Sequence, residues 1–168
     1  MKITIIAAIS SDGFIANDAG VTIKTSQSDK KLLKQLLDSH TTHLYGRKTF
    51  EAVLPILKWS DAPKRYVLTR DHSTITHVAN NAVFVSTLDE LFSRKNKTSS
   101  CLVLGGTALY NFAVEHALAT KIYLTVTPQT LRKGVPFLTK PIMLLRHYTL
   151  SSTKRHKNGE EYRIYTKK

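Results

Sequence analysis

Two short glycine-containing segments carry the residue types that bind phosphate groups. In one, an apolar run ends at Gly105-Gly106 and a predicted helix follows directly. Glycines let a ligand approach the backbone, and the first turn of a helix presents unpaired N–H groups to an anion. In the other, Gly46-Arg47-Lys48-Thr49 adds two cations and a hydroxyl. Together they predict a site for a diphosphate, although each alone also fits a tight turn with solvated surface charges.

Other residue types that carry chemistry have no recognisable pattern. The glycines lack the dinucleotide spacing G-x-G-x-x-G, and the phosphate-binding motif G-x-x-x-x-G-K-[ST] does not occur. The seven histidines are scattered without the spacing of zinc ligands, so we expect no metal site. The single cysteine, Cys101, lies in an apolar run and is expected to be a core thiol.

The overall charge favours anionic ligands. The 168 residues include 25 Lys and Arg against 12 Asp and Glu, which gives a formal net charge of +13. Such a charge fits an enzyme acting on phosphorylated ligands, and it fits a non-catalytic basic protein that binds nucleotides or nucleic acid. The basic residues are spread along the chain, and no nucleic-acid-binding motif is present. We therefore expect no specific nucleic-acid partner and keep the second class as the alternative.

The first apolar run, Ile3–Ile9, is too short for a signal peptide or a membrane helix. We expect it to be a buried strand in a cytoplasmic protein that has no membrane partner.

Short apolar runs alternate with helical patterns along the chain, which predicts strand–helix–strand crossovers. The resulting fold class is α/β, with three layers and a mostly parallel central sheet flanked by helices. We expect one domain over residues 1–168. The predicted strands are Ile3–Ile9, His43–Tyr45, Tyr66–Thr69, Val83–Val85, Cys101–Leu104 and Lys121–Val126, and the predicted helices are Ser28–Ser39, Thr49–Leu54, Leu88–Arg94 and Ala108–His116.

The C-terminal part has a different pattern. Arg146–Thr153 and Glu160–Thr166 flank Asn158-Gly159, a strong signal for a hairpin, so we expect an antiparallel pair at one side of the sheet. The segment 128–142, rich in Pro and Gly, is predicted to be a long structured loop.

Five segments in order along residues 3–138 resemble the dihydrofolate reductase-like superfamily. This superfamily includes dihydrofolate reductase and the reductase domain of the riboflavin-pathway deaminase/reductase. The segments are Ala8–Ala16, Gly46–Glu51, Tyr66–Arg70, Leu104–Tyr110 and Ile122–Thr125.

This resemblance implies an NADPH-dependent reductase that transfers a hydride to a small heterocyclic substrate, either pterin-like or ribosylaminopyrimidine phosphate-like. Ala8 and Ile15 would line the nicotinamide pocket, and Thr69 and Arg70 would border the adenosine 2′-phosphate. The remaining residues implied to bind the cofactor lie at the two glycine turns: Gly46, Arg47, Lys48, Thr49, Gly105, Gly106, Thr107, Ala108, Leu109 and Tyr110.

The resemblance also implies a catalytic pair. Alignment on Gly46 and the first helix brings Asp29 to the acidic position beside the pterin and Thr125 to its hydroxyl partner. A carboxylate there would fix and help to protonate the heterocycle. An acid three residues after the N-cap Ser26 is also favoured by the helix start itself, so both interpretations remain open.

Some residues separate the two branches of the superfamily. Val21–Thr25 replaces the Trp/Leu-Pro segment of dihydrofolate reductases, and Pro63 falls about where an arginine should bind the folate tail. Thr127–Leu138 resembles a loop of the riboflavin-type group, but Leu104 replaces that enzyme's glutamate. We therefore expect a stand-alone reductase closest to the riboflavin-type group, with a true dihydrofolate reductase as the alternative. Homodimerisation is implied by the riboflavin-type relatives.

Overall fold

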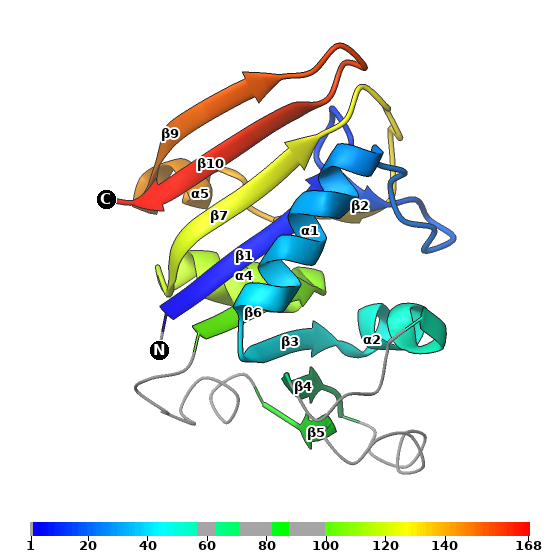
Figure 1. Cartoon of the computed structure of the whole chain (residues 1–168), viewed down its shortest axis with the longest axis vertical. Helices are drawn as coiled ribbons and strands as arrows, with labels where there is room; N and C mark the ends of the chain where they lie inside the picture. Colours follow the sequence, from blue (N-terminus) through cyan, green and yellow to red (C-terminus); the bar gives the residue numbers. More distant parts are fainter. Residues whose placement is uncertain (1, 57–62, 71–81, 88–99) are drawn as a thin grey trace.

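The computed structural model describes residues 2–56, 63–70, 82–87 and 100–168. One eight-stranded sheet, in the order β5-β4-β3-β6-β1-β7-β10-β9, forms the middle layer (Figure 1). All pairings from β5 to β7 are parallel, whereas β10 runs antiparallel to both of its neighbours. The strands of this sheet are β1 (Lys2–Ile9), β3 (Thr42–Gly46), β4 (Lys64–Leu68), β5 (Ala82–Val85), β6 (Ser100–Gly105), β7 (Ala119–Val126), β9 (Tyr148–Arg155) and β10 (Glu161–Lys167).

Helices cover both faces of the sheet, because its central strands are apolar on both sides. Ile5 of β1 belongs to the cluster that contains residues of α4 (Thr107–Glu115) and α5 (Ile142–His147). Ile6, the next residue, packs with Leu36 of α1 (Gln27–Ser39) on the opposite face. The short helix α2 (Arg47–Val53) and the 3-10 turn η1 (Leu54–Ile56) follow β3. This arrangement confirms the predicted three-layer α/β fold with its C-terminal antiparallel hairpin.

The six strands predicted before the hairpin are confirmed to within one or two residues, but two other boundaries were wrong, the start of one helix and the start of one strand. The helix α2 begins at Arg47, two residues before the predicted start, because Gly46 adopts extended angles and serves as the N-cap. The predicted C-terminal strand from Arg146 was also wrong at its start. Arg146 lies in α5, which buries Leu144 in the core. Arg146 and His147 form the basic last turn of this helix, a position that favours positive charge. The predicted helix Leu88–Arg94 lies outside the described residues.

The segment 128–142 contains more structure than the predicted loop. Its strand β8 (Val135–Pro136) pairs with β2 (Phe14–Ala16) to form a second, two-stranded sheet. A side chain at Gly134 would overlap the backbone at Ala16, so this pairing requires a glycine there. The small sheet folds the 128–138 segment over the end of β1.

In the part of the chain that the structure describes, no helix is both long and apolar enough to span a membrane.

Candidate active site

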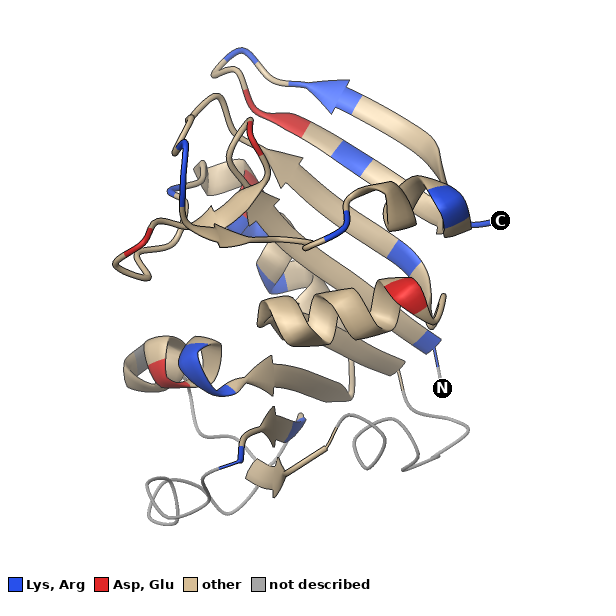
Figure 2. Ribbon diagram, turned by 180° about the vertical axis from the view of Figure 1, so that it is seen from behind, with Lys and Arg blue, Asp and Glu red and all other residues tan. Residues whose placement is uncertain are grey.

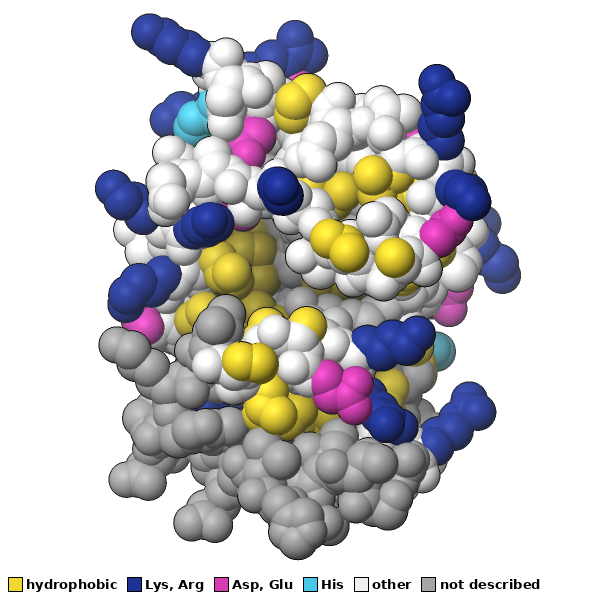
Figure 3. Space-filling model, turned by 90° about the vertical axis from the view of Figure 1, so that its right-hand side faces the viewer, with side chains coloured by type: hydrophobic (Ala, Val, Ile, Leu, Met, Phe, Trp, Pro, Cys, Tyr) yellow, Lys and Arg dark blue, Asp and Glu magenta, His cyan; other side chains and the backbone are white. Residues whose placement is uncertain are grey.

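The parallel strands β1, β3, β4, β6 and β7 all end at the same edge of the sheet. In open α/β sheets, ligands bind in the crevice at this edge. The space-filling view onto this edge shows a hollow lined by hydrophobic side chains above α2 (Figure 3). Site residues predicted from the sequence lie at the ends of these strands: Ala8, Gly46, Thr69, Gly105 and Thr125.

The two glycine turns meet in space. Tyr45 is the register partner of Gly105, and a Cβ atom built on Gly46 would lie 3.1 Å from the Gly106 Cα and 3.2 Å from the Gly105 carbonyl oxygen. A Cβ at Gly105 would lie 2.5 Å from the Thr49 hydroxyl oxygen. Gly106 has a φ of +93°, a conformation that disfavours residues with a side chain. The two turns are therefore packed closely, with no room for a side chain between them, and we call this junction the glycine cradle.

Two helices begin at this cradle. Gly46 is the N-cap of α2 and Gly106 is the N-cap of α4, and neither helix has a side-chain cap. Their first-turn N–H groups and the positive ends of both helices therefore face the same region, as an anion site requires.

The charged residues at the first turn have different surroundings. The Arg47 Nε donates a hydrogen bond of 2.8 Å to the Glu51 carboxylate, one turn along α2. Lys48 is exposed and Thr49 is half-buried. At the end of β4, the Thr69 side chain is buried and its N–H donates to the Val85 carbonyl, whereas Arg70 is exposed.

The residues after Gly106 divide between the site and the core. The Thr107 hydroxyl donates to the Pro136 carbonyl at 2.6 Å, which fastens the turn to β8. Ala108 is exposed, but Leu109 is fully buried. Tyr110 is also buried, and its hydroxyl donates to the Ile6 carbonyl at 2.9 Å. The Leu109 and Tyr110 side chains are therefore core groups, and a ligand at this turn would meet backbone atoms.

The expected pair, Asp29 and Thr125, lies together. The Thr125 hydroxyl donates to Asp29 Oδ1 at 2.5 Å, although the two residues are 96 positions apart. Both side chains are buried. Ala8 is the register partner of Thr125 and is the one half-buried residue in the otherwise buried run Ile3–Ile9. The carboxylate therefore lies beside the end of β1. Ile15 on β2 is half-buried and packs against the main core.

A second buried carboxylate, which the sequence analysis did not identify, holds the start of α1. Glu160 accepts hydrogen bonds from the Ser26 N–H at 2.7 Å and the Ser26 hydroxyl at 2.5 Å. The Tyr162 hydroxyl adds a third bond at 3.3 Å. Burial opposes the ionisation of Glu160, but the bonds from Ser26 outweigh it and hold its pKa below the usual value. The sequence signal for this role was weak, since Glu160 merely follows the hairpin turn.

The loop after β1 is fastened in a similar way. Asp12 accepts hydrogen bonds from the Ser10 hydroxyl at 2.6 Å and from the backbone N–H groups of Leu131 and Arg132. The Ser10 bond is the main reason that the Asp12 pKa lies below its usual value. These contacts hold the loop after β1 against the 128–138 segment. Among the described residues, no group of three His, Cys, Asp or Glu side chains could hold a metal ion.

Comparisons with known proteins agree with this geometry. The sequence profile of the dihydrofolate reductase family matches residues 2–167. A relative from Escherichia coli, dihydrofolate reductase type 15, is 32% identical over 118 residues, which cover 68% of this chain and 69% of that protein.

Solved structures show the same fold. A protein from Shewanella sp. PV-4, assigned to riboflavin biosynthesis, has a TM-score of 0.75 at 18% identity and covers 100% of this chain and 99% of its own. Dihydrofolate reductase from Enterococcus faecalis, in complex with NADP(H), has a TM-score of 0.73 at 16% identity, covering 99% and 96%. A deaminase/reductase from Thermotoga maritima has a TM-score of 0.76 at 14% identity, covering 99% and 56%. With this fold, these paired turns and the match of residues 2–167, the chain belongs to the dihydrofolate reductase family.

Proposed function

We propose that this protein is an NADPH-dependent reductase that transfers a hydride to the C=N bond of a pterin such as dihydrofolate. The observation that carries the proposal is the buried Asp29 carboxylate, bonded to Thr125 and placed beside the end of β1, next to the glycine cradle. A heterocycle with adjacent N–H groups is the ligand that such a carboxylate can hold.

The cradle fits the proposed cofactor. The diphosphate would lie on the outer surface of Gly46, Gly105 and Gly106, whose backbones are packed so closely that no side chain fits between them. The uncapped first turns of α2 and α4 would donate N–H groups to it. The exposed Arg70 at the end of β4 would bind the 2′-phosphate, which distinguishes NADPH from NADH. When bound, NADPH would supply the hydride.

Asp29 would orient the substrate and help to move the proton. Addition of a hydride to the carbon of a C=N bond requires one proton at the nitrogen. Among the described residues, Asp29 receives a side-chain bond from Thr125 through Oδ1, which leaves Oδ2 for the substrate's N–H groups. Held in this way, the ring would face the end of β1 with solvent excluded, and a proton could reach its nitrogen through the carboxylate or a water molecule bonded to it.

The test combines binding with turnover. Titration with NADPH, followed by its fluorescence, should give a micromolar dissociation constant and weaker binding of NADH. Depletion of NADPH at 340 nm should then require dihydrofolate. Turnover with a ribosylaminopyrimidinone phosphate in place of dihydrofolate would move the chain to the riboflavin-type substrate class. Absence of NADPH binding at near-millimolar concentration would refute the proposal as a whole.

The charge of the surface does not favour nucleic-acid binding. On the described residues, Lys and Arg are scattered over the hairpin, the loops and α2, and Asp and Glu lie among them (Figure 2). A nucleic-acid interface would gather basic side chains on one face. We therefore expect no steeply salt-dependent binding of duplex DNA, that is, a log–log slope near zero.

A further inference from the structure

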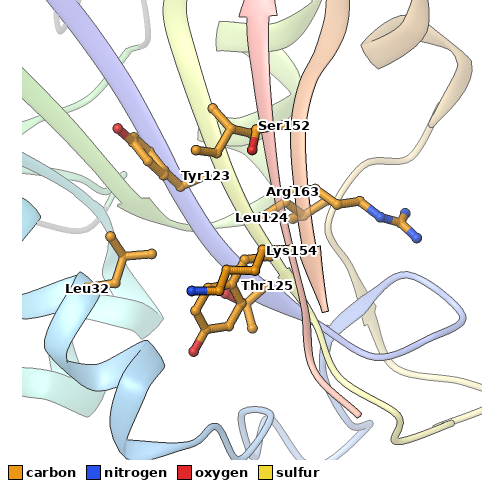
Figure 4. A pocket seen from close by; sticks show the side chains of 9 residues that line it. Leu32, Tyr123, Leu124, Thr125, Ser152, Lys154 and Arg163 are labelled. Atoms are coloured by element: carbon orange, nitrogen blue, oxygen red, sulfur yellow. The ribbon is translucent and has the colours of Figure 1, made fainter. Parts of the chain in front are cut away.

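A second hollow opens beside α1, next to the Asp29–Thr125 pair and not at the two glycine turns. It has a volume of about 220 Å³ and lies between α1 and the face formed by β7, β10 and β9 (Figure 4). Strand register explains its walls: Ile164 of β10 is paired with Tyr123 on one side and with Ser152 on the other. The neighbouring row places Tyr162 between Thr125 and Lys154.

The hollow is apolar inside and polar at its rim. Leu32 of α1, Tyr123 and Ile164 are half-buried, so their apolar surfaces line the inner part. Ser152 and Lys154 come from β9, the edge strand, and both are exposed. Figure 4 shows Lys154 extending toward α1, whereas the Arg163 side chain points away from the hollow. Arg163 is bonded to Glu161, so Lys154 is the cation that a ligand in the hollow would meet.

The size and chemistry of this hollow select a class of ligand. Pockets for drug-sized molecules hold about 300–1,000 Å³, so a smaller hollow suits one ring. A flat apolar ring can lie against Leu32, Tyr123 and Ile164, and a charged substituent can then reach the rim. An ammonium and a hydroxyl at that rim favour an anion.

We propose that this hollow is a binding site for a single-ring aromatic carboxylate, with its ring on Leu32, Tyr123 and Ile164 and its carboxylate at Lys154 and Ser152. The hollow borders the proposed reductase site, because Thr125 lines it and also donates to Asp29. Binding, not turnover, is the property predicted, so this proposal stands or fails independently of the proposed function.

The experiment uses the full chain, labelled with ¹⁵N and saturated with NADPH where NADPH binds. Titration with 4-hydroxybenzoate should shift the amide resonances of β9, β10 and the middle of α1, with an affinity of about millimolar for a ligand of this size. The uncharged isostere 4-hydroxybenzamide should bind at least about fivefold more weakly, because it lacks the pair with Lys154.

Two variants locate the site. Lys154→Met should weaken 4-hydroxybenzoate about fivefold and leave 4-hydroxybenzamide unchanged, whereas the matched control Lys167→Met should change neither. Leu32→Trp should fill the hollow and abolish binding of both compounds. Three results would each overturn the proposal. They are resonance shifts that map to Gly46 and Gly105, equal affinity for the acid and the amide, and an absence of shifts at ligand concentrations well above the expected dissociation constant.

Discussion

Replacement of Gly46 by alanine tests whether the two turns grip one ligand. A Cβ at this position would lie 3.1 Å from the Gly106 Cα, 3.2 Å from the Gly105 oxygen and 3.6 Å from the Gly106 nitrogen. All three neighbours are backbone atoms, so no side chain can rotate out of the way. Ordinary contacts of a Cβ begin at 3.4 Å, and the turns must therefore separate by a few tenths of an ångström.

The magnitude follows from the cost of overpacking, which is about 1–3 kcal/mol for an added methyl group in a well-packed region. If the turns stay together, this cost lowers the free energy of unfolding. If they separate, the backbone N–H groups no longer converge on the diphosphate, and the cost lowers the affinity for NADPH. We expect Gly46→Ala to show both effects, with a dissociation constant raised about tenfold for each 1.4 kcal/mol lost from binding.

The assay is the NADPH fluorescence titration, paired with urea unfolding of the same preparations. Gly159→Ala is the matched control, because Gly159 has a φ of +86° and lies at the β9–β10 hairpin, where a Cβ would lie 3.3 Å from the Pro128 side chain. This control should lower stability and leave the NADPH affinity unchanged. An unchanged NADPH affinity in Gly46→Ala would refute the reasoning that the turns form one cofactor cradle.

Three further changes test the site and its support. Asp29→Asn should lower kcat by about 100-fold or more with dihydrofolate, since it removes the charge that orients and protonates the ring, and should leave NADPH binding intact. Glu160→Gln should lower turnover, because Glu160 holds the start of α1 and so the position of Asp29. It should also reduce the loss of stability in acid. The pKa of Glu160 is lower in the folded protein than its value of 4.5 in the unfolded chain, so its contribution to the free energy of unfolding is present above pH 4.5 and is lost as the pH falls through the folded pKa. Burial lowers the pKa of His43 from 6.5 to about 4, so on acidification His43 takes up its proton at a lower pH in the folded protein than in the unfolded chain. The free energy of unfolding should therefore fall by about 3 kcal/mol between pH 6.5 and 4, and His43→Gln should remove this slope in urea titrations at each pH.

The sheet was predictable because each of its central strands has an apolar sequence pattern of its own. The runs around Ile5, Leu44, Val67, Val103 and Leu124 are apolar on both faces, and only a parallel sheet between helix layers buries such runs. The nearness of Gly46 and Gly105 then followed, because both residues stand at the carboxyl ends of adjacent parallel strands.

Shorter elements could not be predicted in the same way. The pairing of β2 with β8 involves strands of three and two residues, and neither is long enough to show an alternating pattern. The helix α5 has only six residues, too few to show a helical period, and it runs directly into β9. Tyr110 illustrates a different limit, because its position in the motif predicts the turn but not the direction of its ring. The ring packs in the core, with its centroid 4.9 Å from the centroid of the Phe137 ring.

Asp29 was the least predictable residue, because its place at the start of α1 supports two explanations. In a capping box, an acid at this position bonds the backbone N–H of the N-cap residue. Here the Ser26 N–H donates to Glu160 instead, and the Ser26 oxygen accepts from the Asp29 N–H at 3.3 Å. Glu160, 134 residues away, thus performs the reciprocal half of the cap, which frees the Asp29 carboxylate to turn to Thr125. Sequence spacing along α1 cannot reveal this exchange, because the residue that makes it belongs to the far end of the chain.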